Sequence, residues 1–323
     1  MQAIVQDTYG SADVLELRTI DTPSIDDGEV LIQVRAAGLD RGVWHLMTGL
    51  PYPIRVAGYG LRAPKMPTRG RELAGVVSAV GKDVTRFAPG DEVFGIGEGT
   101  FATYAVARED KLASKPANLT FEEAAAVSIS ALTALQAVRD HGAITAGQRV
   151  LVIGASGGVG TFAVQIAKAF GAEVTGVCST GKVDLVRSLG VDHVVDYTKD
   201  DFADANTRYD VIIDTGGNAS LSRLRRVLSP KGTLVIVGGE TGGRVLGGFD
   251  RGLRAVAISP FTGQRLKAMM CSENHEDLTV LAGLVESGTV RPVVERSYPL
   301  AETSDAIRHM EQGSVRGKVV ISI

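Results

Sequence analysis

The sequence predicts an α/β protein of two domains, one rich in short strands and one built on a doubly wound parallel sheet. The length of 323 residues exceeds that of one ordinary domain. From residue 149 onward, apolar runs typical of buried strands alternate with helical stretches, at 149–153, 173–178, 193–195, 210–214, 233–238 and 253–258. A strand-like pattern returns after about residue 289. We therefore expect one domain over 1–118 and 290–323, and the parallel-sheet domain over 119–289.

The first 118 residues show the alternation and the turn chemistry of short strands. Apolar and polar residues alternate over 29–36, and a second strand-like run covers 73–81. Pro89-Gly90-Asp91 form a turn before a third strand at 92–95. Glycine and proline recur at short intervals, which favours a compact barrel of short strands.

Helices and a terminal strand pair are predicted on either side of the parallel sheet. Thr120 and Glu123 form a capping box, and the alanine-rich run that follows predicts one long helix to Val138. After the sheet we expect, in order, a strand at 293–298, a helix at 303–310 and a strand at 317–323. The last strand is expected to rejoin the first domain.

Composition and charge exclude several function classes. Hydrophobic residues make up 44% of the chain, charged residues make up 22%, and the formal net charge is −3. This balance favours neither nucleic acid nor a membrane as a partner. Cys178 and Cys271 are far apart and fit neither a disulfide framework nor structural zinc spacing. The chain begins with a strand-like run instead of a basic, apolar leader, so we expect a cytoplasmic protein.

The turn after the first strand of the parallel sheet is the most informative motif. It matches G-x-G-x-x-G except that Ala155 takes the place of the first glycine. A strand precedes it, and an amphipathic helix that stops at Gly171 follows it. Such a turn directs backbone N–H groups and the positive end of the helix at a phosphate pair. We expect a dinucleotide here, a purely structural turn being the alternative, with contacts from Ala155, Ser156, Gly157, Gly158, Val159 and Gly160.

The residues after the second strand indicate which dinucleotide binds. NAD sites place a carboxylate about 20 residues after the glycines, to bind the ribose hydroxyls. This chain has Ser179 and Lys182 there and no acid, which suits a 2′-phosphate. Tyr197, after the next strand, supplies a further hydroxyl. The alternatives are a solvated lysine and a packed edge tyrosine. We predict NADPH as the cofactor.

Several motifs in this order resemble the medium-chain dehydrogenase/reductase superfamily, in its zinc-free quinone-oxidoreductase-like branch. The motifs are Val34–Asp40, Gly70–Val77, Phe87–Gly95, Gly154–Gly160 and Gly317–Val320, and they span essentially the whole chain. Cys178-Ser179-Thr180 and the run 183–190 are similar to the subgroup of the mitochondrial reticulon-interacting oxidoreductase and its bacterial relatives. The resemblance implies a GroES-like β-rich catalytic domain and a Rossmann domain, with the active site in the cleft between them.

The resemblance also implies further cofactor contacts. Gly238 and Gly239 end the fifth strand, and Ser259 and Phe261 follow the sixth, beside the nicotinamide. Lys318, on the terminal strand, is a weaker cofactor candidate. The loop that starts at Gly238 is either a mobile lid or a slack connection.

Two departures from the zinc-dependent members predict chemistry without a metal. Asp40 stands where those members have a cysteine ligand, and Arg71 stands where they have a histidine. Asp40, His45 and Glu72 offer metal ligands in principle, but the fixed charge of Arg71 opposes a divalent ion. We therefore predict no metal.

Without a Lewis acid, quinones and α,β-unsaturated carbonyls are the substrates that suit the chain. Their conjugation stabilises the anion formed when hydride arrives, so weak hydrogen-bond donors suffice. The resemblance points to Asp40, His45, Tyr52 and Thr133 as catalytic candidates. An enoyl-thioester reductase and a non-catalytic nucleotide-binding protein remain the alternative functions. The resemblance makes a homodimer through the edge of the parallel sheet one option, and the sequence leaves the oligomeric state open.

Overall fold

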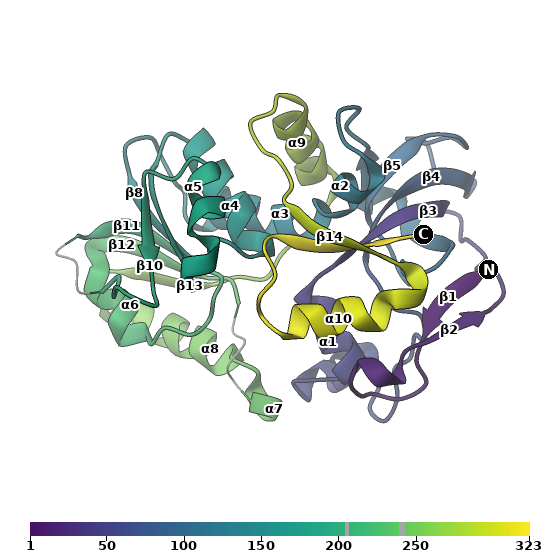
Figure 1. The fold of residues 1–323 in the computed structure, drawn as a ribbon, viewed down its shortest axis with the longest axis horizontal. Coiled ribbons are helices and arrows are strands. Elements are labelled where there is room, and N and C mark those ends of the chain that lie inside the picture. The colour runs from purple at the N-terminus through teal and green to yellow at the C-terminus, as the bar shows by residue number, and fades with distance from the viewer. Residues whose placement is uncertain (204–206, 239–242) are drawn as a thin grey trace. The chain divides into compact units, whose positions relative to one another are not determined.

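The described chain divides into two units, and each is built around its own sheet. The computed structural model describes residues 1–203, 207–238 and 243–323 (Figure 1). Unit 1 comprises residues 1–132 and 273–323, and unit 2 comprises residues 133–272. These boundaries lie inside the predicted domain of 119–289. The reason is that α2 (Phe121–Ala125) packs on the sheet of unit 1, and α9 (His275–Glu286) also contacts a strand of that unit.

Unit 1 contains a seven-stranded sheet that runs in the order β14-β15-β3-β4-β5-β7, with β6 also paired to β3. The predicted alternation produces β3, in which Val30, Ile32 and Val34 are buried. The terminal strand pairs antiparallel with β3, which confirms that it rejoins the first part of the chain. The strands are β3 (Glu29–Leu39), β4 (Glu72–Val80), β5 (Glu92–Ile96), β6 (Tyr104–Arg108), β7 (Leu112–Ser114), β14 (Val294–Pro299) and β15 (Lys318–Ser322).

The remaining elements of unit 1 are a small two-stranded sheet, helices and short turns of helix. They are β1 (Gln2–Val5), β2 (Glu16–Thr19), α1 (Arg41–Thr48), α10 (Thr303–Glu311), η1 (Ala12–Val14), η2 (Arg55–Tyr59), η3 (Glu109–Lys111) and η7 (Leu300–Glu302). The predicted helix at 303–310 is confirmed as α10, whose Ala306 and Ile307 are buried. Trp44, from α1, packs against the same core.

The long helix predicted to reach Val138 is interrupted. The predicted capping box is present in α2, but the helix stops at Ala125 and restarts as α3 (Ser128–Gln136), followed by η4 (Ala137–His141). At the restart, the backbone N–H groups of Ile129 and Ser130 donate to the Glu72 carboxylate, 2.7 and 3.3 Å away. A side-chain acceptor thus replaces the carbonyl partners that a continuous helix supplies.

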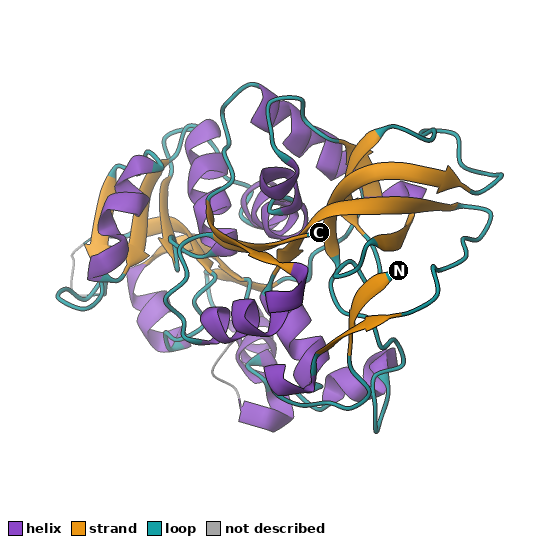
Figure 2. Ribbon diagram, turned by 45° about the vertical axis from the view of Figure 1, so that its right-hand side comes forward, coloured by secondary structure: helices purple, strands orange, loops and turns teal. Residues whose placement is uncertain are grey.

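Unit 2 is the predicted doubly wound sheet. Its six strands are all parallel and run in the order β10-β9-β8-β11-β12-β13. Helices α4 and α5 cover one face, and α6 and α8 cover the other (Figures 1 and 2). The elements are β8 (Arg149–Ile153), α4 (Gly158–Ala169), β9 (Glu173–Cys178), η5 (Thr180–Lys182), α5 (Val183–Ser188), β10 (His193–Asp196), β11 (Tyr209–Asp214), α6 (Leu221–Val227), β12 (Leu228–Ile236), α7 (Gly243–Leu246), α8 (Phe249–Ile258), η6 (Ser259–Phe261) and β13 (Arg265–Ala268).

One strand of the parallel sheet is predicted in the wrong place. Residues 253–258 form the second half of α8, and the sixth strand is β13. The apolar residues of 249–258 lie at a helical spacing that leaves Gly252 and Ala255 buried. Gly252 brings this helix close to β13, because a Cβ there would lie 2.9 Å from that of Ala268. Short apolar runs fit both periods, and here the helix satisfies the packing.

No helix in the described ranges is long and apolar enough to cross a membrane.

Candidate cofactor and substrate sites

The glycine turn after β8 has a shape that only glycine permits. Gly154 has φ of +80°, and a Cβ on Gly160 would lie 2.0 Å from the Gly154 carbonyl oxygen. Gly157 forms the N-cap of α4, and no described side chain caps it. The first N–H groups of the helix therefore point out of the turn without an intrahelical acceptor. This arrangement suits a phosphate pair.

The other predicted members of the turn divide into supporting and facing residues. Ala155 is fully buried, and its N–H donates to the Val177 carbonyl oxygen at 3.1 Å, which ties the turn to β9. Ser156 is also buried, whereas Gly158 and Val159 are partly exposed on the first turn of α4. Within the motif, the N–H groups of the first turn of α4 are thus the groups placed to contact a ligand.

The predicted phosphate-binding residues lie at the carboxyl ends of β9 and β10. Ser179 is the N-cap of η5 and Lys182 is its last residue; both are partly exposed, and Tyr197 is 62% exposed. A carboxylate that the sequence reasoning missed, Asp196, is close by, because β10 places it beside Cys178 in register. The only available signal was the acid at the end of the third strand.

Asp196 is already engaged by its neighbours. Its carboxylate accepts hydrogen bonds from the hydroxyls of Thr180 and Thr198, at 2.6 and 2.8 Å, and Lys199 lies 3.5 Å away. The hydrogen bond from Thr180 is the main cause that lowers the pKa of Asp196 to about 2. The group is therefore ionised at neutral pH, and its charge is shared among these partners.

A second turn, after β11, closes against the glycine turn. The Thr215 hydroxyl donates to the Ile153 carbonyl oxygen at 2.8 Å, and a Cβ on Gly154 would lie 2.5 Å from that hydroxyl oxygen. Gly238, at the end of β12, approaches the Thr215 carbonyl oxygen. Gly239 lies outside the described residues. Asp214, which ends β11, is fully buried and forms an ion pair with Arg251 of α8.

Ser259 and Phe261 are not at this edge of the sheet, contrary to the prediction. They form η6, which precedes β13, and the Ser259 hydroxyl oxygen accepts from Leu266 N–H at 3.0 Å near the strand's amino end. The displaced sixth strand explains the error. The residues that follow β13 at the carboxyl edge are Met269 and Met270, and Met270 is 85% exposed.

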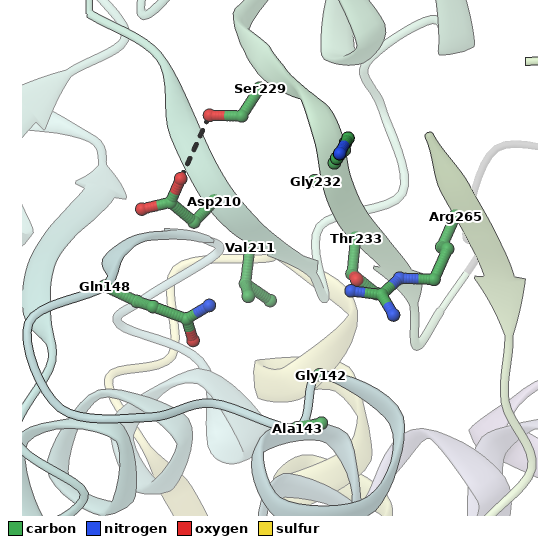
Figure 3. A pocket seen from close by; sticks show the side chains of 10 residues that line it. Gly142, Ala143, Gln148, Asp210, Val211, Ser229, Gly232, Thr233 and Arg265 are labelled. Carbon is green, nitrogen blue, oxygen red and sulfur yellow. Dashed lines mark hydrogen bonds between the residues drawn. The ribbon is translucent and has the colours of Figure 1, made fainter. Parts of the chain in front are cut away.

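A separate cavity lies at the opposite, amino edge of the parallel sheet. It has a volume of about 220 Å³ and is lined by Asp210, Ser229, Lys231 and Arg265 among others (Figure 3). Asp210 is already bonded to the Ser229 hydroxyl at 3.1 Å and to the Arg149 N–H at 3.0 Å. Since parallel sheets bind dinucleotides at their carboxyl ends, this cavity is not the cofactor site.

Unit 1 contains three of the four predicted catalytic residues, and two of them share α1. Asp40 is the N-cap of α1, where Oδ1 accepts from Val43 N–H at 3.0 Å, while Oδ2 is buried with no hydrogen-bond partner among the described residues. His45, on the next turn, uses Nδ1 to bond the Leu50 carbonyl oxygen at 2.7 Å. Both side chains are therefore held by local backbone contacts.

Tyr52 and Thr133 complete the predicted catalytic set. Tyr52 is 45% exposed, and the Arg55 guanidinium stacks 5.2 Å from the centre of its ring. Thr133 lies on α3 within unit 2, and its side chain is 9% exposed.

A buried ion pair joins β4 to β15. Glu72 and Lys318 are 0% and 2% exposed, and their side chains are in hydrogen-bond contact. Gly38 makes room for the carboxylate, since a Cβ there would lie 2.2 Å from Glu72 Oε2. Burial raises the pKa of Glu72 to about 7, and the Lys318 ammonium opposes that shift. Lys318, the weaker cofactor candidate, is thus engaged by Glu72 inside unit 1, which agrees with the structural role that the sequence left as its alternative.

Arg71, which the resemblance places at a zinc-ligand position, and the buried carboxylate next to it are each engaged in an ion pair. Arg71 bonds Glu273 at 2.9 Å, and Lys111 bonds the same carboxylate oxygen at 2.9 Å. The Lys318 ammonium occupies the carboxylate of Glu72. Across the described ranges, no cluster of three or more histidine, cysteine or acidic residues is arranged to hold a metal.

Comparisons with known proteins agree with this architecture. Residues 26–117 match the alcohol dehydrogenase GroES-like domain, and residues 189–321 match the zinc-binding dehydrogenase family. The chain is 32% identical to the mitochondrial NAD(P)H oxidoreductase RTN4IP1 of Mus musculus, over 100% of this chain and 89% of that protein. It is 33% identical to the chloroplastic NADPH-dependent alkenal/one oxidoreductase of Arabidopsis thaliana, over 99% and 79%.

A solved structure gives the same result. The quinone oxidoreductase of Coxiella burnetii superposes with a TM-score of 0.88 at 28% identity, and the match covers 100% of this chain and 99% of that one. The fold, the order of the motifs and the full-length relatives agree. The chain therefore belongs to the medium-chain dehydrogenase/reductase superfamily, in its quinone-oxidoreductase-like branch.

Proposed function

We propose that this chain is an NADPH-dependent oxidoreductase that reduces a quinone or another α,β-unsaturated carbonyl without zinc. The observation that carries the proposal is the close-packed glycine turn, whose Gly160 leaves no room for a Cβ and whose α4 N-terminus has no side-chain cap. The printed names of its relatives support the reaction class, since they include an NADPH-dependent alkenal/one oxidoreductase and a quinone oxidoreductase.

The preference for NADPH rests on the groups at the ends of β9 and β10. Ser179 donates through its hydroxyl, and Lys182 adds positive charge, which suits the 2′-phosphate. Asp196 repels a nearby phosphate less strongly than an isolated carboxylate would. Its negative charge is stabilised by hydrogen bonds from the Thr180 and Thr198 hydroxyls and by the Lys199 ammonium.

A variant tests this preference. Lys182→Ala is expected to raise the KM for NADPH about tenfold and to leave the KM for NADH unchanged, as for one lost charged hydrogen bond. Lys231→Ala, at the opposite edge of the same sheet, is the matched control. Equal effects on both cofactors would reject the proposed role of Lys182.

Independence from zinc rests on the charges in unit 1. One carboxylate oxygen of Asp40 accepts the N-cap hydrogen bond of α1. Arg71 forms an ion pair with Glu273, and Lys318 forms an ion pair with Glu72. A divalent ion would have to displace an ammonium group and tolerate a guanidinium close by. Full activity after removal of metal ions is the expected result.

The mechanism that the residues support is positioning by hydrogen bonds. When bound, the reduced nicotinamide supplies the hydride to the conjugated carbon of the substrate. Conjugation delivers the negative charge to the carbonyl oxygen, where a modest donor stabilises it. Tyr52 has an exposed phenol that is able to donate there, and Asp40, His45 and Thr133 remain the other candidates.

The substrate class is tested with one enzyme preparation and three acceptors. We expect NADPH oxidation with an ortho-quinone or a short enone to exceed that with an enoyl thioester. Tyr52→Phe should lower kcat/KM, with Tyr104→Phe of β6 as the matched phenol control. Full turnover and affinity in Tyr52→Phe would remove Tyr52 from the mechanism, and a preference for the thioester would favour an enoyl-thioester reductase.

Location and assembly are further parts of the proposal. A cytoplasmic location stays a prediction, because the relatives include mitochondrial and chloroplastic proteins. We propose a homodimer through β13, one of the two edge strands of the described parallel sheet, and light scattering of the purified protein would measure its mass.

A further inference from the structure

Arg251 carries buried hydrogen-bond donors that no described residue accepts. Its Nη2 donates to Asp214 Oδ2, and Asp214 Oδ1 accepts from Gly217 N–H at 3.1 Å. Asp214 is fully buried, and the Arg251 side chain is 13% exposed. Nε and Nη1 of Arg251 are buried and have no acceptor within the described part of the chain. Buried donors without partners are unfavourable and uncommon in native proteins.

A purely structural ion pair leaves this pattern unexplained. Arginine and a carboxylate frequently meet through two parallel hydrogen bonds, one from each of two guanidinium nitrogens. Here one nitrogen contacts the carboxylate, and the pair still fixes the position of the guanidinium. Because Asp214 neutralises Arg251, the remaining donors recognise an acceptor through directed hydrogen bonds more than through net charge.

The pair lies at the carboxyl edge of the sheet, next to the turn that holds the cofactor motif. Asp214 ends β11, which pairs with β8 up to Ile153, and Thr215 N–H donates to the Ile153 carbonyl oxygen at 3.1 Å. The helices change faces between β8 and β11, which makes this point the topological switch where dinucleotides cross such sheets. Ser179 and Lys182 lie on the β9 side, so Arg251 lies on the half that receives the nicotinamide.

We infer that Arg251 is a binding residue, whose Nε and Nη1 donate to a carbonyl or hydroxyl oxygen at the nicotinamide end of the reaction site. This inference rests on the proposed function. Two sources offer that chemistry, namely the nicotinamide half of the cofactor and the carbonyl group of the substrate. Asp214 is the positioning residue that holds the guanidinium in place.

The experiment compares three Arg251 variants with a control from the same helix. Arg251→Lys keeps a cation for Asp214 but lacks the fork, and Arg251→Met removes both. Arg251→Met with Asp214→Asn removes the buried charge as well, and serves if the single Met variant does not fold. Arg254→Met is the control, because the Arg254 side chain is 72% exposed and pairs with Asp250 on the surface of α8.

Three measurements are made on each protein: two binding titrations and one steady-state kinetic series. Calorimetry gives the dissociation constants of NADPH and of 2′,5′-ADP, which has the adenosine 2′-phosphate but no nicotinamide half. Steady-state kinetics with an ortho-quinone gives kcat and KM. The acceptor oxygen lies on the cofactor if the dissociation constant of NADPH rises by about tenfold or more while that of 2′,5′-ADP is unchanged. Unchanged binding of both nucleotides with a similar fall in kcat/KM would place it on the substrate.

Other outcomes overturn the inference. If Arg251→Lys and the double variant both give the same results as Arg254→Met in all three measurements, the role of Arg251 is purely structural. Equal weakening of NADPH and 2′,5′-ADP would show general damage to unit 2. Wild-type protein that binds neither nucleotide would refute the proposed function itself, and the inference with it.

Discussion

Replacement of Lys318 by methionine tests whether the Glu72–Lys318 contact is a buried ion pair. The change leaves a fully buried carboxylate without its cation, while the N–H groups of Ile129 and Ser130 remain. Removal of one partner of such a pair costs about 3–5 kcal/mol. We expect unit 1 of Lys318→Met to lose a free energy of unfolding of that size at pH 8.

The loss should depend on pH with a definite sign. Burial raises the pKa of Glu72 to about 7, so the folded state binds this proton more tightly than the unfolded state does. The stability from that proton is fully present below the unfolded pKa and is lost as pH rises through about 7. In Lys318→Met the opposing ammonium is absent, so the pKa of Glu72 rises further. At pH 5 the carboxyl is neutral, and the deficit should fall to about 1–2 kcal/mol, near that of one hydrogen bond.

Guanidinium unfolding followed by tryptophan fluorescence measures this quantity. Trp44 is the only tryptophan of the chain and lies in unit 1. Lys82→Met is the matched control, because Lys82 pairs with Asp27 on the surface and should contribute less than about 1 kcal/mol at either pH. Glu72→Gln combined with Lys318→Met should recover most of the loss. Equal deficits at pH 5 and pH 8 would refute the reasoning.

Two further substitutions have expected effects on binding and on stability. Gly160→Ala should abolish measurable NADPH binding by calorimetry, because its methyl would meet the Gly154 carbonyl oxygen at 2.0 Å, and wild-type affinity in a folded variant would contradict the proposed turn. Gly283→Ala, within α9, meets nothing within 4 Å and should raise the free energy of unfolding of unit 1 by about 0.5–1 kcal/mol. A lower free energy of unfolding in the same guanidinium titration would contradict the open space beside Gly283 on α9.

Local patterns predicted most of the elements because their physics is local. The alternation that gives β3, the capping box at Thr120 and the turn at Gly154–Gly160 all depend on neighbours in the sequence. The break between α2 and α3 was missed, since its cause is a carboxylate of β4 that no local pattern reveals. The run 253–258 was misassigned because six apolar-rich residues fit a strand and a helix equally well.

The residues of the candidate site likewise divide into those that a local pattern reveals and those that depend on contacts between distant segments. The phosphate-binding turn follows from glycine spacing. The place of Asp196 beside Cys178 and the separate contact between Asp214 and Arg251 arise only through strand register and helix packing. Lys318 shows the converse, because a basic residue in a family motif is buried against Glu72. Because the sixth strand was predicted at 253–258, Ser259 and Phe261 were predicted at the wrong edge of the sheet.

Turnover of an ortho-quinone by protein stripped of metal ions tests the central claim most directly, with NADPH and NADH compared in parallel. We expect turnover that strongly prefers NADPH and does not rise when zinc is added back. Activity that appears only with zinc, or that shows no preference between the cofactors, would contradict it.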